Sequence, residues 1–560
     1  MRNTRSVSVD ELYGVFKRLD GRGYKRYREL YGMDILFNGF IGRFTRIQPD
    51  PYAPPSIFEV RVSRSVHGLD PKLYRGRNIV PVCDFIYRLL YHGLSRYSSK
   101  CGSGYSCYLG VPRPSPVILL RSAVEFEHDD LILRFYVGLP ARGRLILGDR
   151  AYSVLVEKIP KTLSFIYRLK DKYREELLDH IELYRDYVFL KNWLYRSGYV
   201  AFIADNSILP RESSVSDRPL PNAKPFKSPL NLRREIRLPS GRVLSGMVLP
   251  RGLTIVTGGG YHGKTTLLNS LAEAIYPHIR GDGREYVVVI DKTMYVEAEN
   301  GRIINCVDIS AFIDNLPNNI DTKCFSSLNA SGSTSMAASI NEAIEAGVEL
   351  LLIDEDTSAT NLLYKDRFIK EVIREEPITT LVELVKSMIR ETNTSFIIVS
   401  SASSAFLSLA DTIILMQNYA PRHLEKHEIP ETSLYEGLEK RYNNPRKRVF
   451  KGIKDYVEIK ARGYRLTIKY RDTKYELRLD RNPRIVEKGQ VKMIAYIIDY
   501  IVRKKITGTV EELIDYINKL FREKGFKAYT KTIIPPDLTW IDGLDVIWVL
   551  NRLYNTVFLQ

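Results

Sequence analysis

Glycines, a lysine and a threonine are concentrated in one short segment, residues 258–265. Two of the glycines lie five positions apart and are followed by Lys-Thr, which is the pattern of a phosphate-binding loop. Because glycine lacks a Cβ, backbone N–H groups can approach a phosphate closely. We expect Lys264 to contact the β- and γ-phosphates of a nucleotide, and the Thr265 hydroxyl to bind Mg²⁺. The expected nucleotide contacts are Gly258, Gly259, Gly260, Tyr261, His262, Gly263, Lys264, Thr265 and Thr266.

The segments on either side of this loop favour the same chemistry. The apolar run 253–256 predicts a strand that leads into the loop, and residues 266–274 predict a helix that follows it. This order directs backbone N–H groups and the positive end of the helix towards the phosphates. A chance glycine-rich turn is the alternative, and the flanking elements disfavour it.

Two adjacent acids end a second apolar segment. Residues 348–353 form a nearly continuous apolar run, as a strand buried on both faces requires, and Asp354 and Glu355 follow it. Acids at the carboxyl edge of a parallel sheet lie where ligands bind. We expect Asp354 to hold Mg²⁺ through water and Glu355 to polarise an attacking water. The alternative is a pair of solvated acids at the end of a strand.

A loop of small residues forms a second candidate anion site. Residues 329–335 precede a predicted helix over 336–346, and a serine and a glycine at a helix N-terminus can bind an anion through backbone N–H groups. We expect Ser331, Gly332 and Ser333 to contact a phosphate. A flexible polar loop is the alternative interpretation.

These segments resemble known ATPases. The loop 329–335 resembles the signature motif of ABC ATPases, with Ser331 and Gly332 in its Ser-Gly positions. The chain as a whole resembles a family of ABC-class ATPases outside the transporters, strongly over residues 10–420 and weakly towards the C-terminus, where 550–553 are most similar. The segments that carry the resemblance are residues 19–24, 50–56, 138–144, 202–205, 260–264, 281–285, 330–334 and 354–361.

The resemblance implies an α/β fold: a P-loop NTPase core of ABC type, with an α+β N-terminal domain and a small α+β C-terminal domain. We place the domains at residues 1–180, 181–430 and 431–560. The resemblance also implies a homodimer that hydrolyses ATP with Mg²⁺, in which Ser331, Gly332 and Ser333 cap the nucleotide of the partner chain. RNA handling is the biological role that it implies.

Two positions depart from the usual ABC pattern. Residues 396–401 predict the next strand, and Ser401 stands where most of these ATPases place a histidine that contacts the γ-phosphate. We assign Ser401 to the catalytic group with Glu355 and Lys264. The chain also has no glutamine between Lys264 and Ser331, where a metal-contacting glutamine is usual. The departures concern the rate of hydrolysis more than the binding of nucleotide.

Two acids are candidates for the role of the missing glutamine. We expect Glu297 or Asp308 to contact the metal instead, and we place Asp308 with Thr265 and Asp354 in the metal site. Between the two candidates, Asn300-Gly301 separates two segments of alternating polarity, which predicts a tight hairpin there.

The composition points to a polyanionic partner. The chain of 560 residues carries a net charge of +17, and such a field attracts polyanions. Tyrosines are interleaved with cations, which would bind phosphates while the aromatic faces stack on bases. We expect a nucleic acid, and the resemblance favours RNA. The two basic clusters are Lys17, Arg18, Arg22, Lys25, Arg26 and Arg28 with Tyr24, Tyr27 and Tyr31; and Lys440, Arg441, Arg446, Lys447, Arg448, Lys451 and Lys454 with Tyr442, Tyr456, Tyr464 and Tyr470.

Other functions remain open at this stage. The basic segments would also suit a solvated surface with its tyrosines in cores, and the ATPase would then move a protein partner. A transporter subunit is disfavoured, because the coupling glutamine is absent and large domains flank the core. The five cysteines are too few for a disulfide scaffold, and Cys101 and Cys107 would either pair or, as we favour, stay reduced. No apolar signal-peptide core or membrane span is expected, so we predict a cytoplasmic protein, and its scarce glutamines suggest a thermophile.

Overall fold

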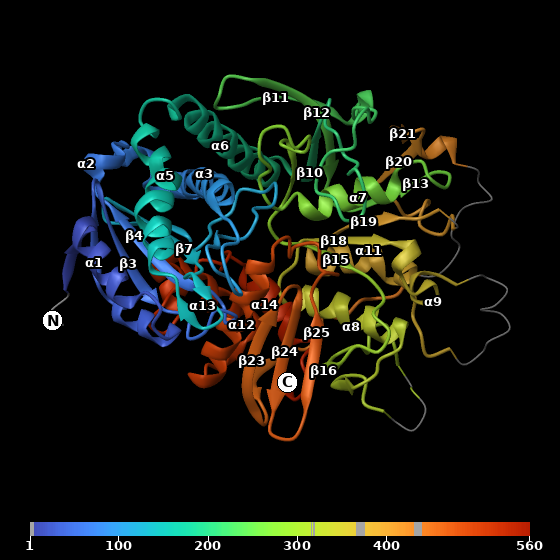
Figure 1. Ribbon diagram of the computed structural model, residues 1–560. Coiled ribbons are helices and arrows are strands. Elements are labelled where there is room, and N and C mark those ends of the chain that lie inside the picture. Colours follow the sequence, from blue (N-terminus) through green and yellow to red (C-terminus); the bar gives the residue numbers. More distant parts are fainter. Residues whose placement is uncertain (1–4, 315, 317–319, 366–375, 402, 430–438) are drawn as a thin grey trace. The chain divides into compact units, whose positions relative to one another are not determined.

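The computed structural model describes residues 5–314, 316, 320–365, 376–401, 403–429 and 439–560, and the chain divides into two compact units. The first unit contains Met1–Tyr184 and Lys524–Trp540, and the second contains Arg185–Glu523 and Ile541–Gln560. Figure 1 labels the helices and strands of each unit. None of the helices in the described ranges combines the length and apolar composition of a membrane span. Residues 1–4, which belong to the segment expected to lack a signal peptide, lie outside the described residues.

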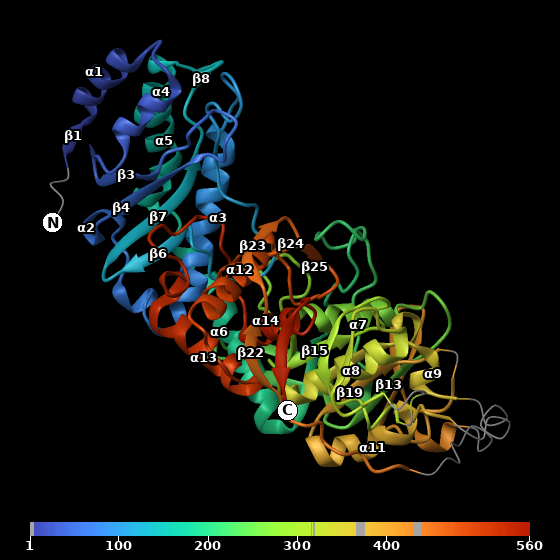
Figure 2. The ribbon, with the colours of Figure 1, turned by 90° about the horizontal axis from the view of Figure 1, so that it is seen from below.

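The first unit is built on a seven-stranded sheet of order β1-β2-β3-β4-β7-β5, with β6 also paired to β7. Only the β1–β2 pair among these is parallel. The long helix α3 (Ile79–Tyr97) packs against β5 and β6 (Figure 2). The strands are β1 (Ser6–Ser8), β2 (Asp34–Phe37), β3 (Phe40–Arg46), β4 (Ser56–Val62), β5 (Leu109–Gly110), β6 (Val124–Glu127) and β7 (Asp130–Val137), with a small pair β8 (Ala141–Arg142) and β9 (Leu145–Ile146).

The sequence predicts a first helix over residues 9–19, and the structure has it there. Ser8 caps α1 (Val9–Leu19): its side chain accepts from the Glu11 N–H, and the Glu11 carboxylate accepts from the Ser8 N–H at 2.7 Å. This reciprocal capping box satisfies N–H groups that an α-helix leaves unpaired. The shorter helices of the unit are α2 (Arg64–His67), α4 (Gly148–Ser153) and α5 (Ile159–Leu163).

The spacing of Leu, Ile and Tyr over residues 161–194 predicts one helix, but the structure interrupts it. After α5 and a 3₁₀ turn at Ser164–Arg168, a new helix, α6, runs over Arg174–Ser197. The break falls at a run of charged residues, and α6 restarts with Glu175 and Glu176 in its first turn. Acids are favoured there, because the N-terminal end of a helix carries partial positive charge.

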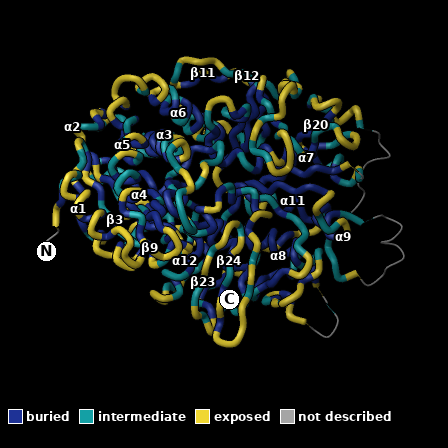
Figure 3. Tube along the Cα trace, in the orientation of Figure 1, coloured by how far each residue is buried: buried dark blue, intermediate teal, exposed yellow. Residues whose placement is uncertain are grey.

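The second unit contains a six-stranded sheet of order β15-β18-β19-β13-β20-β21, parallel except for the edge strand β21. Its central strands are buried along their length, as Figure 3 shows. The helices α7 and α8 lie on opposite faces of this sheet (Figure 1). The strands are β13 (Leu253–Thr257), β15 (Thr293–Val296), β18 (Leu350–Asp354), β19 (Ser395–Val399), β20 (Thr412–Gln417) and β21 (Ala420–Leu424), and the helices are α7 (Lys264–Glu273), α8 (Gly332–Glu345), α9 (Thr360–Leu363) and α11 (Leu381–Thr392).

Smaller sheets complete this unit. One is an antiparallel sheet of order β11-β12-β10-β14, in which β14 follows the phosphate loop in sequence and the other strands precede it. Two three-stranded sheets, β26-β22-β27 and β23-β24-β25, lie in the C-terminal part. Helix α12 packs against β23. The bounds are β10 (Tyr199–Ala204), β11 (Arg233–Arg237), β12 (Val243–Pro250), β14 (Val287–Val289), β16 (Ile304–Val307), β17 (Phe325–Ser327), β22 (Val449–Ile453), β23 (Tyr456–Arg462), β24 (Arg465–Tyr470), β25 (Lys474–Arg478), β26 (Gly508–Thr509), β27 (Thr556–Leu559), α12 (Lys488–Arg503), α13 (Val510–Lys524) and α14 (Gly543–Leu550).

The hairpin predicted at Asn300-Gly301 is wrong. Gly301 does adopt a left-handed turn with φ 82°, but the strands on either side join different sheets. β15 pairs with β18 in the parallel sheet, whereas β16 pairs with β17. A turn does form at Gly301, as predicted. The strand before it, β15, pairs with β18 because its apolar residues are buried in the parallel sheet.

Both pairs of closely placed cysteines form disulfides. Cys101–Cys107 closes a short loop with a Cα–Cα distance of 5.6 Å, so the expectation of reduced thiols there is wrong. The loop folds back on itself through the Cys101 N–H, which donates to the Ser106 carbonyl. Cys306–Cys324 joins the neighbouring strand segments β16 and β17, with a Cα–Cα distance of 4.1 Å. No local pattern predicts this second pair, because 18 positions separate its cysteines.

Candidate nucleotide-binding site

The phosphate loop connects β13 to α7. Gly258 has φ 137°, and a Cβ at this position would lie 2.3 Å from the Met416 carbonyl oxygen of β20, so only glycine fits. Gly263 has φ 93° and precedes the first residue of α7, Lys264. The strand therefore turns sharply into the helix, and the N-terminal end of α7 faces the interior of the loop.

Lys264 is folded back onto its own loop. Its Nζ donates to the carbonyl oxygens of Gly258 and Gly259 at 2.8 and 2.7 Å, and the residue is only 7% exposed. The cation is thus held within the loop that would surround the phosphates.

Thr265 and Asp354 come together from two elements. The Thr265 hydroxyl, in the first turn of α7, donates to Oδ2 of Asp354 at 2.9 Å. Asp354 is the last residue of β18 and is fully buried. Burial raises the pKa of its carboxyl group, although the Thr265 hydroxyl and the Asp356 N–H counteract this shift. A hydroxyl and a carboxylate so close together fit Mg²⁺, because this ion prefers oxygen ligands.

Tyr364, Ser400 and Ser401 donate to Glu355. Its Oε1 accepts from the Tyr364 hydroxyl at 2.9 Å, and its Oε2 accepts from the Ser401 N–H at 2.6 Å and the Ser400 hydroxyl at 3.3 Å. Ser401 thus meets Glu355 through its backbone. Tyr364 was missed by the sequence analysis, since nothing in its local sequence distinguishes it from a core tyrosine.

The second candidate anion site lies at the start of α8. Ser331 caps this helix, with its Oγ accepting from the Thr334 N–H at 3.3 Å, so the helix starts at Gly332 instead of the predicted Met336. The Ser333 hydroxyl donates to Oδ1 of Asn361 at 2.7 Å. In the described part of the chain, no hydrogen bond joins residues 329–335 to residues 258–265.

The two candidates for the missing glutamine differ in position. The carboxylate of Asp308 accepts from the Ser310 hydroxyl at 2.7 Å and from the Arg446 N–H at 3.4 Å, so the structure does not bring it to Thr265 and Asp354. Glu297 directly follows β15, whose Val296 is paired in register with Ile353. It therefore follows its strand beside Asp354, and the register favours Glu297 over Asp308 as the additional acid.

The comparisons with known proteins agree with this geometry. A family model described as the ABC_ATPase P-loop domain matches residues 173–454, which is half of the chain. The chain belongs to the ABC-class ATPases. Two further models match this ABC-class ATPase: "ATPase of the ABC class N-terminal" over residues 9–168 and "MRB1590 C-terminal domain" over residues 458–558. These matches and the mixed sheets and helices confirm the predicted fold class, while our domain boundaries at residues 180 and 430 stay predictions.

A relative from Methanocaldococcus jannaschii, uncharacterized protein MJ1628, is 26% identical to this ABC-class ATPase over 381 residues. The aligned part covers 66% of the present chain and 80% of the relative. Its printed name gives no activity, so the similarity adds to the family assignment but not to the choice of partner.

The tyrosines of the basic clusters are mostly core residues. In the first unit, Tyr24 and Tyr27 are buried and donate to the carbonyls of Leu139 and Pro140 at 3.1 and 2.7 Å. In the second unit, Tyr442 and Tyr470 are buried and hydrogen-bonded. These four rings are therefore not available to stack on bases, and the stacking prediction is wrong for them, whereas Tyr31 is exposed.

One cation of the second cluster is also internal. Arg448 is 1% exposed, and it donates to both carboxylate oxygens of Glu345 through its backbone N–H and its Nε, at 2.6 and 2.8 Å. Exposed cations remain beside it at Arg446, Lys451 and Lys454. The electrostatic part of the nucleic-acid prediction rests on these exposed side chains.

Proposed function

We propose that this ABC-class ATPase binds ATP with Mg²⁺ and hydrolyses it as a head-to-tail homodimer. The observation that carries the proposal is the meeting of Thr265, Asp354 and Glu355 at the carboxyl edge of one parallel sheet, where the phosphate loop also ends. This edge is where ligands bind in open α/β sheets.

Lys264 would bind the β- and γ-phosphates. Its present partners are two neutral loop carbonyls. Phosphate oxygens would replace these neutral acceptors with anionic ones, so that Coulomb attraction adds to the hydrogen bonds of the ammonium group. The N–H groups of the loop and the first turn of α7 would supply the remaining donors.

Thr265 and Asp354 would hold Mg²⁺, and Glu297 would contribute from the neighbouring strand end. When bound, the ion neutralises charge on the β- and γ-phosphate oxygens. The buried carboxylate of Asp354 is costly without a nearby cation, and burial raises its pKa accordingly. A site that favours a cation at this carboxylate is therefore consistent with its environment.

Glu355 would orient the attacking water and accept its proton. A positioned general base contributes about 10²–10⁴ in rate. The Tyr364 hydroxyl and the Ser401 N–H hold one oxygen each, which fixes the plane of the carboxylate. Ser401 stands where related ATPases have a histidine, but its backbone N–H still donates to Glu355.

The start of α8 would complete the site of a second chain. Among the residues that the structure describes, Ser331 and Gly332 form a helix N-terminus with no hydrogen bond to their own phosphate loop. On that loop, Tyr261 is 96% exposed and has φ 62°, a conformation that is a strained outlier for an aromatic residue. Backbone strain of this kind is often retained at functional sites, and here it presents an aromatic ring at the face that would meet a partner.

The direct test of nucleotide-driven pairing is sizing of the Glu355→Gln variant. Removal of the base should leave ATP bound and the dimer trapped, so light scattering should report a doubled mass with ATP and a monomer without it. Lys264→Ala in the same background is the control and should stay monomeric. A Glu355→Gln variant that binds ATP yet remains a monomer at all concentrations would refute the head-to-tail site.

We also propose that the dimer binds RNA through exposed cations. The net charge of +17 and the exposed Arg446, Lys451 and Lys454 support this proposal. Binding of this kind weakens with salt, with a slope of about 0.7 per phosphate contact for single strands.

Arg446→Glu with Lys451→Glu tests the RNA proposal. The pair should weaken RNA retention at least tenfold and lower the salt slope. Lys100→Glu with Lys161→Glu makes the same change of net charge at other exposed positions and should have a much smaller effect. If both pairs act equally, or if pull-downs yield only proteins, the protein-remodelling alternative is favoured instead.

A further inference from the structure

Two buried arginines surround the middle of α8. Arg302 donates to both carboxylate oxygens of Glu342 at 2.5 Å and to the Ser339 hydroxyl at 2.5 Å. Arg552, two residues beyond α14, donates to both oxygens of Glu299, with Nε 3.0 Å from Oε2. The two arginines are 5% and 3% exposed, so this cluster of charges is shielded from water.

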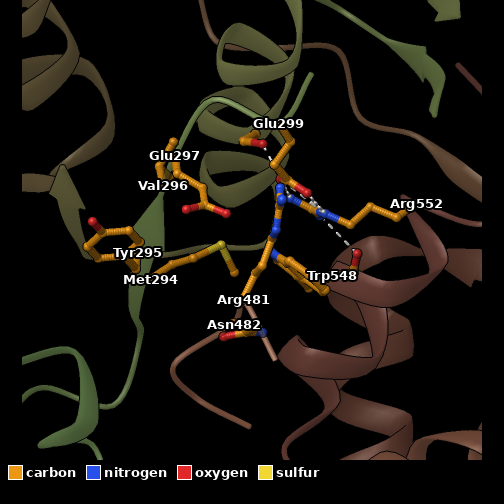
Figure 4. Close-up of a pocket in the computed structure, with 10 residues that line it drawn as sticks. Met294, Tyr295, Val296, Glu297, Glu299, Arg481, Asn482, Trp548 and Arg552 are labelled. Carbon is orange, nitrogen blue, oxygen red and sulfur yellow. Dashed lines mark hydrogen bonds and ion pairs between the residues drawn. The ribbon is translucent and has the colours of Figure 1, made fainter. Parts of the chain in front are cut away.

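Residues 541–560, called the C-terminal segment below, also contact Arg552. Its guanidinium lies 3.7 Å from the centroid of the Trp548 ring, and its Nη1 donates to the Trp548 carbonyl at 2.9 Å. Figure 4 shows two arginines extending towards Glu297 and Glu299. Arg552 comes from the C-terminal segment, and Arg481 comes from the loop between β25 and α12. The charges of Arg552 and Arg302 outweigh the effect of burial and hold the pKa of Glu299 at about 2.

The segment that carries Glu299 touches the candidate site at three points. The Glu299 N–H donates to the Ser335 hydroxyl, in the first turn of α8, at 2.9 Å. The preceding Ala298 N–H donates to the Thr357 carbonyl, just after Glu355, at 2.9 Å. Two backbone bonds pair Gly301 and Arg302 with Ala330, which adjoins Ser331.

We propose that Arg552 is a positioning residue that links the C-terminal segment to the start of α8. By holding Glu299, it sets the orientation of the first turn of α8 and of the loop after Glu355. Through them it sets the direction in which Ser331 and Gly332 point. This inference rests on the proposed function for its consequence, the capping of a partner's ATP. Its structural core, control of α8 by Arg552, holds in a single chain.

The cluster has a form that suits such a link. A buried ion pair stabilises no better than well-packed apolar residues of the same volume, and one partner left alone is strongly unfavourable. Glu299 is therefore coupled to the placement of Arg552, since any shift of α14 that withdraws the guanidinium leaves a buried carboxylate short of its partner. Binding at the C-terminal segment can act on the ATP site by this route.

Hydrogen exchange of the Arg552→Met variant, compared with the parent, tests the proposal without nucleotide. Methionine keeps an apolar side chain over Trp548 but removes the charge. Exchange of amides 329–336 and 355–361 should accelerate at least fivefold, while α7 and β13 stay unchanged. Arg552→Lys, which keeps the charge, should recover part of the protection.

Arg484→Met is the matched control. Arg484 is also buried and also holds α14, through Asp545, but its other partners are the carbonyls of Asp291 and Thr293 at the beginning of β15. It should destabilise the same C-terminal segment without changing exchange at 329–336. Equal exchange changes in the two variants would show a merely structural role and overturn the proposal.

Sizing with ATP separates the inference from the proposed function. In the Glu355→Gln background, Arg552→Met should bind ATP within about twofold of the parent but require at least tenfold more protein to dimerise. Failure of the parent itself to dimerise would contradict the proposed function, and the exchange data would still decide whether Arg552 controls α8. Unchanged dimerisation in Arg552→Met, beside a parent that dimerises, would overturn only the inference.

Discussion

The phosphate loop and the start of α8 are both glycine-containing helix N-termini, but they are connected very differently. The loop is joined to the end of β18 by a side-chain hydrogen bond from Thr265 to Asp354. The start of α8 is joined instead to α9, through Asn361, and to the segment that carries Glu299. The phosphate loop therefore has beside it Asp354, the residue that we propose as a metal ligand, whereas the start of α8 is not hydrogen-bonded to the end of β18 among the described residues.

We propose that this difference reflects two different roles, one in binding the nucleotide and one in completing the site of another chain. A phosphate loop with its own acids can bind a nucleotide alone, whereas an isolated helix end with small polar residues can only complete a site that another surface supplies. Its connections run to the C-terminal arginines, so it is the half that the rest of the chain can adjust. The following substitutions act on one half at a time.

Lys264→Ala should have the largest effect, because it removes the only lysine of the phosphate loop. We expect nucleotide affinity to fall by about 10³, on the basis of several lost charge-assisted hydrogen bonds worth about 1.5–3 kcal/mol each. Isothermal titration with ATP measures the change. Affinity within tenfold of the parent would show that the lysine does not contact the phosphates.

Glu355→Gln should come next, with catalysis reduced by about 10²–10⁴ and affinity retained. Tyr364→Phe is the milder companion, because it removes one donor to the same carboxylate, and we expect a loss of about tenfold in turnover. Phosphate release under saturating ATP measures both. Full turnover by Glu355→Gln would assign the base to another residue.

Ser401 offers a comparison within one position. Its contact to Glu355 is a backbone N–H, so Ser401→Ala should change turnover less than about twofold, whereas Ser401→Pro removes the donor and should cost about tenfold or more. Steady-state rates of the two variants show whether the backbone N–H or the hydroxyl of Ser401 supports turnover. A large loss in Ser401→Ala would mean that the hydroxyl takes the role of the usual histidine.

In the nucleotide-free protein, the effect of Asp354→Asn on stability should be the smallest of these changes. Burial raises the folded-state pKa of this carboxyl group above its unfolded value. The ionised carboxylate therefore destabilises the fold at high pH, and this destabilisation disappears as pH falls and the group becomes protonated. The amide removes the buried charge, and it should raise the melting temperature of the nucleotide-free protein by about 2 °C at pH 8. The gain should shrink towards pH 4, and a gain independent of pH would contradict the explanation.

Much of the nucleotide site could be predicted because its residues are contiguous. The loop 258–265 and the pair Asp354-Glu355 each occupy one short segment next to a strand. Tyr364 could not be found, since its hydroxyl reaches Glu355 only after α9 turns the chain back. The start of α8 was placed too late because Ser331 was interpreted as part of a loop, although it serves as the cap.

Long-range partners and burial account for the remaining differences. Glu299 and Arg552 are 253 positions apart, and no local pattern indicates that they pair. Asn300-Gly301 predicted a turn correctly but not the sheets that its flanking strands join. The tyrosines of the basic clusters were interpreted as stacking residues because spacing shows aromatic content, whereas only the fold shows that Tyr27 and Tyr442 are buried.

The central claim, that the start of α8 acts on the nucleotide of another chain, is tested most directly by mixing two inactive variants. Lys264→Ala damages the phosphate loop, and Ser331→Arg blocks the start of α8. A mixed dimer of the two retains one intact composite site if the halves come from different chains. The account predicts that each variant alone is inactive and that an equimolar mixture regains about a quarter of parental turnover. A mixture that stays as inactive as its components would contradict it.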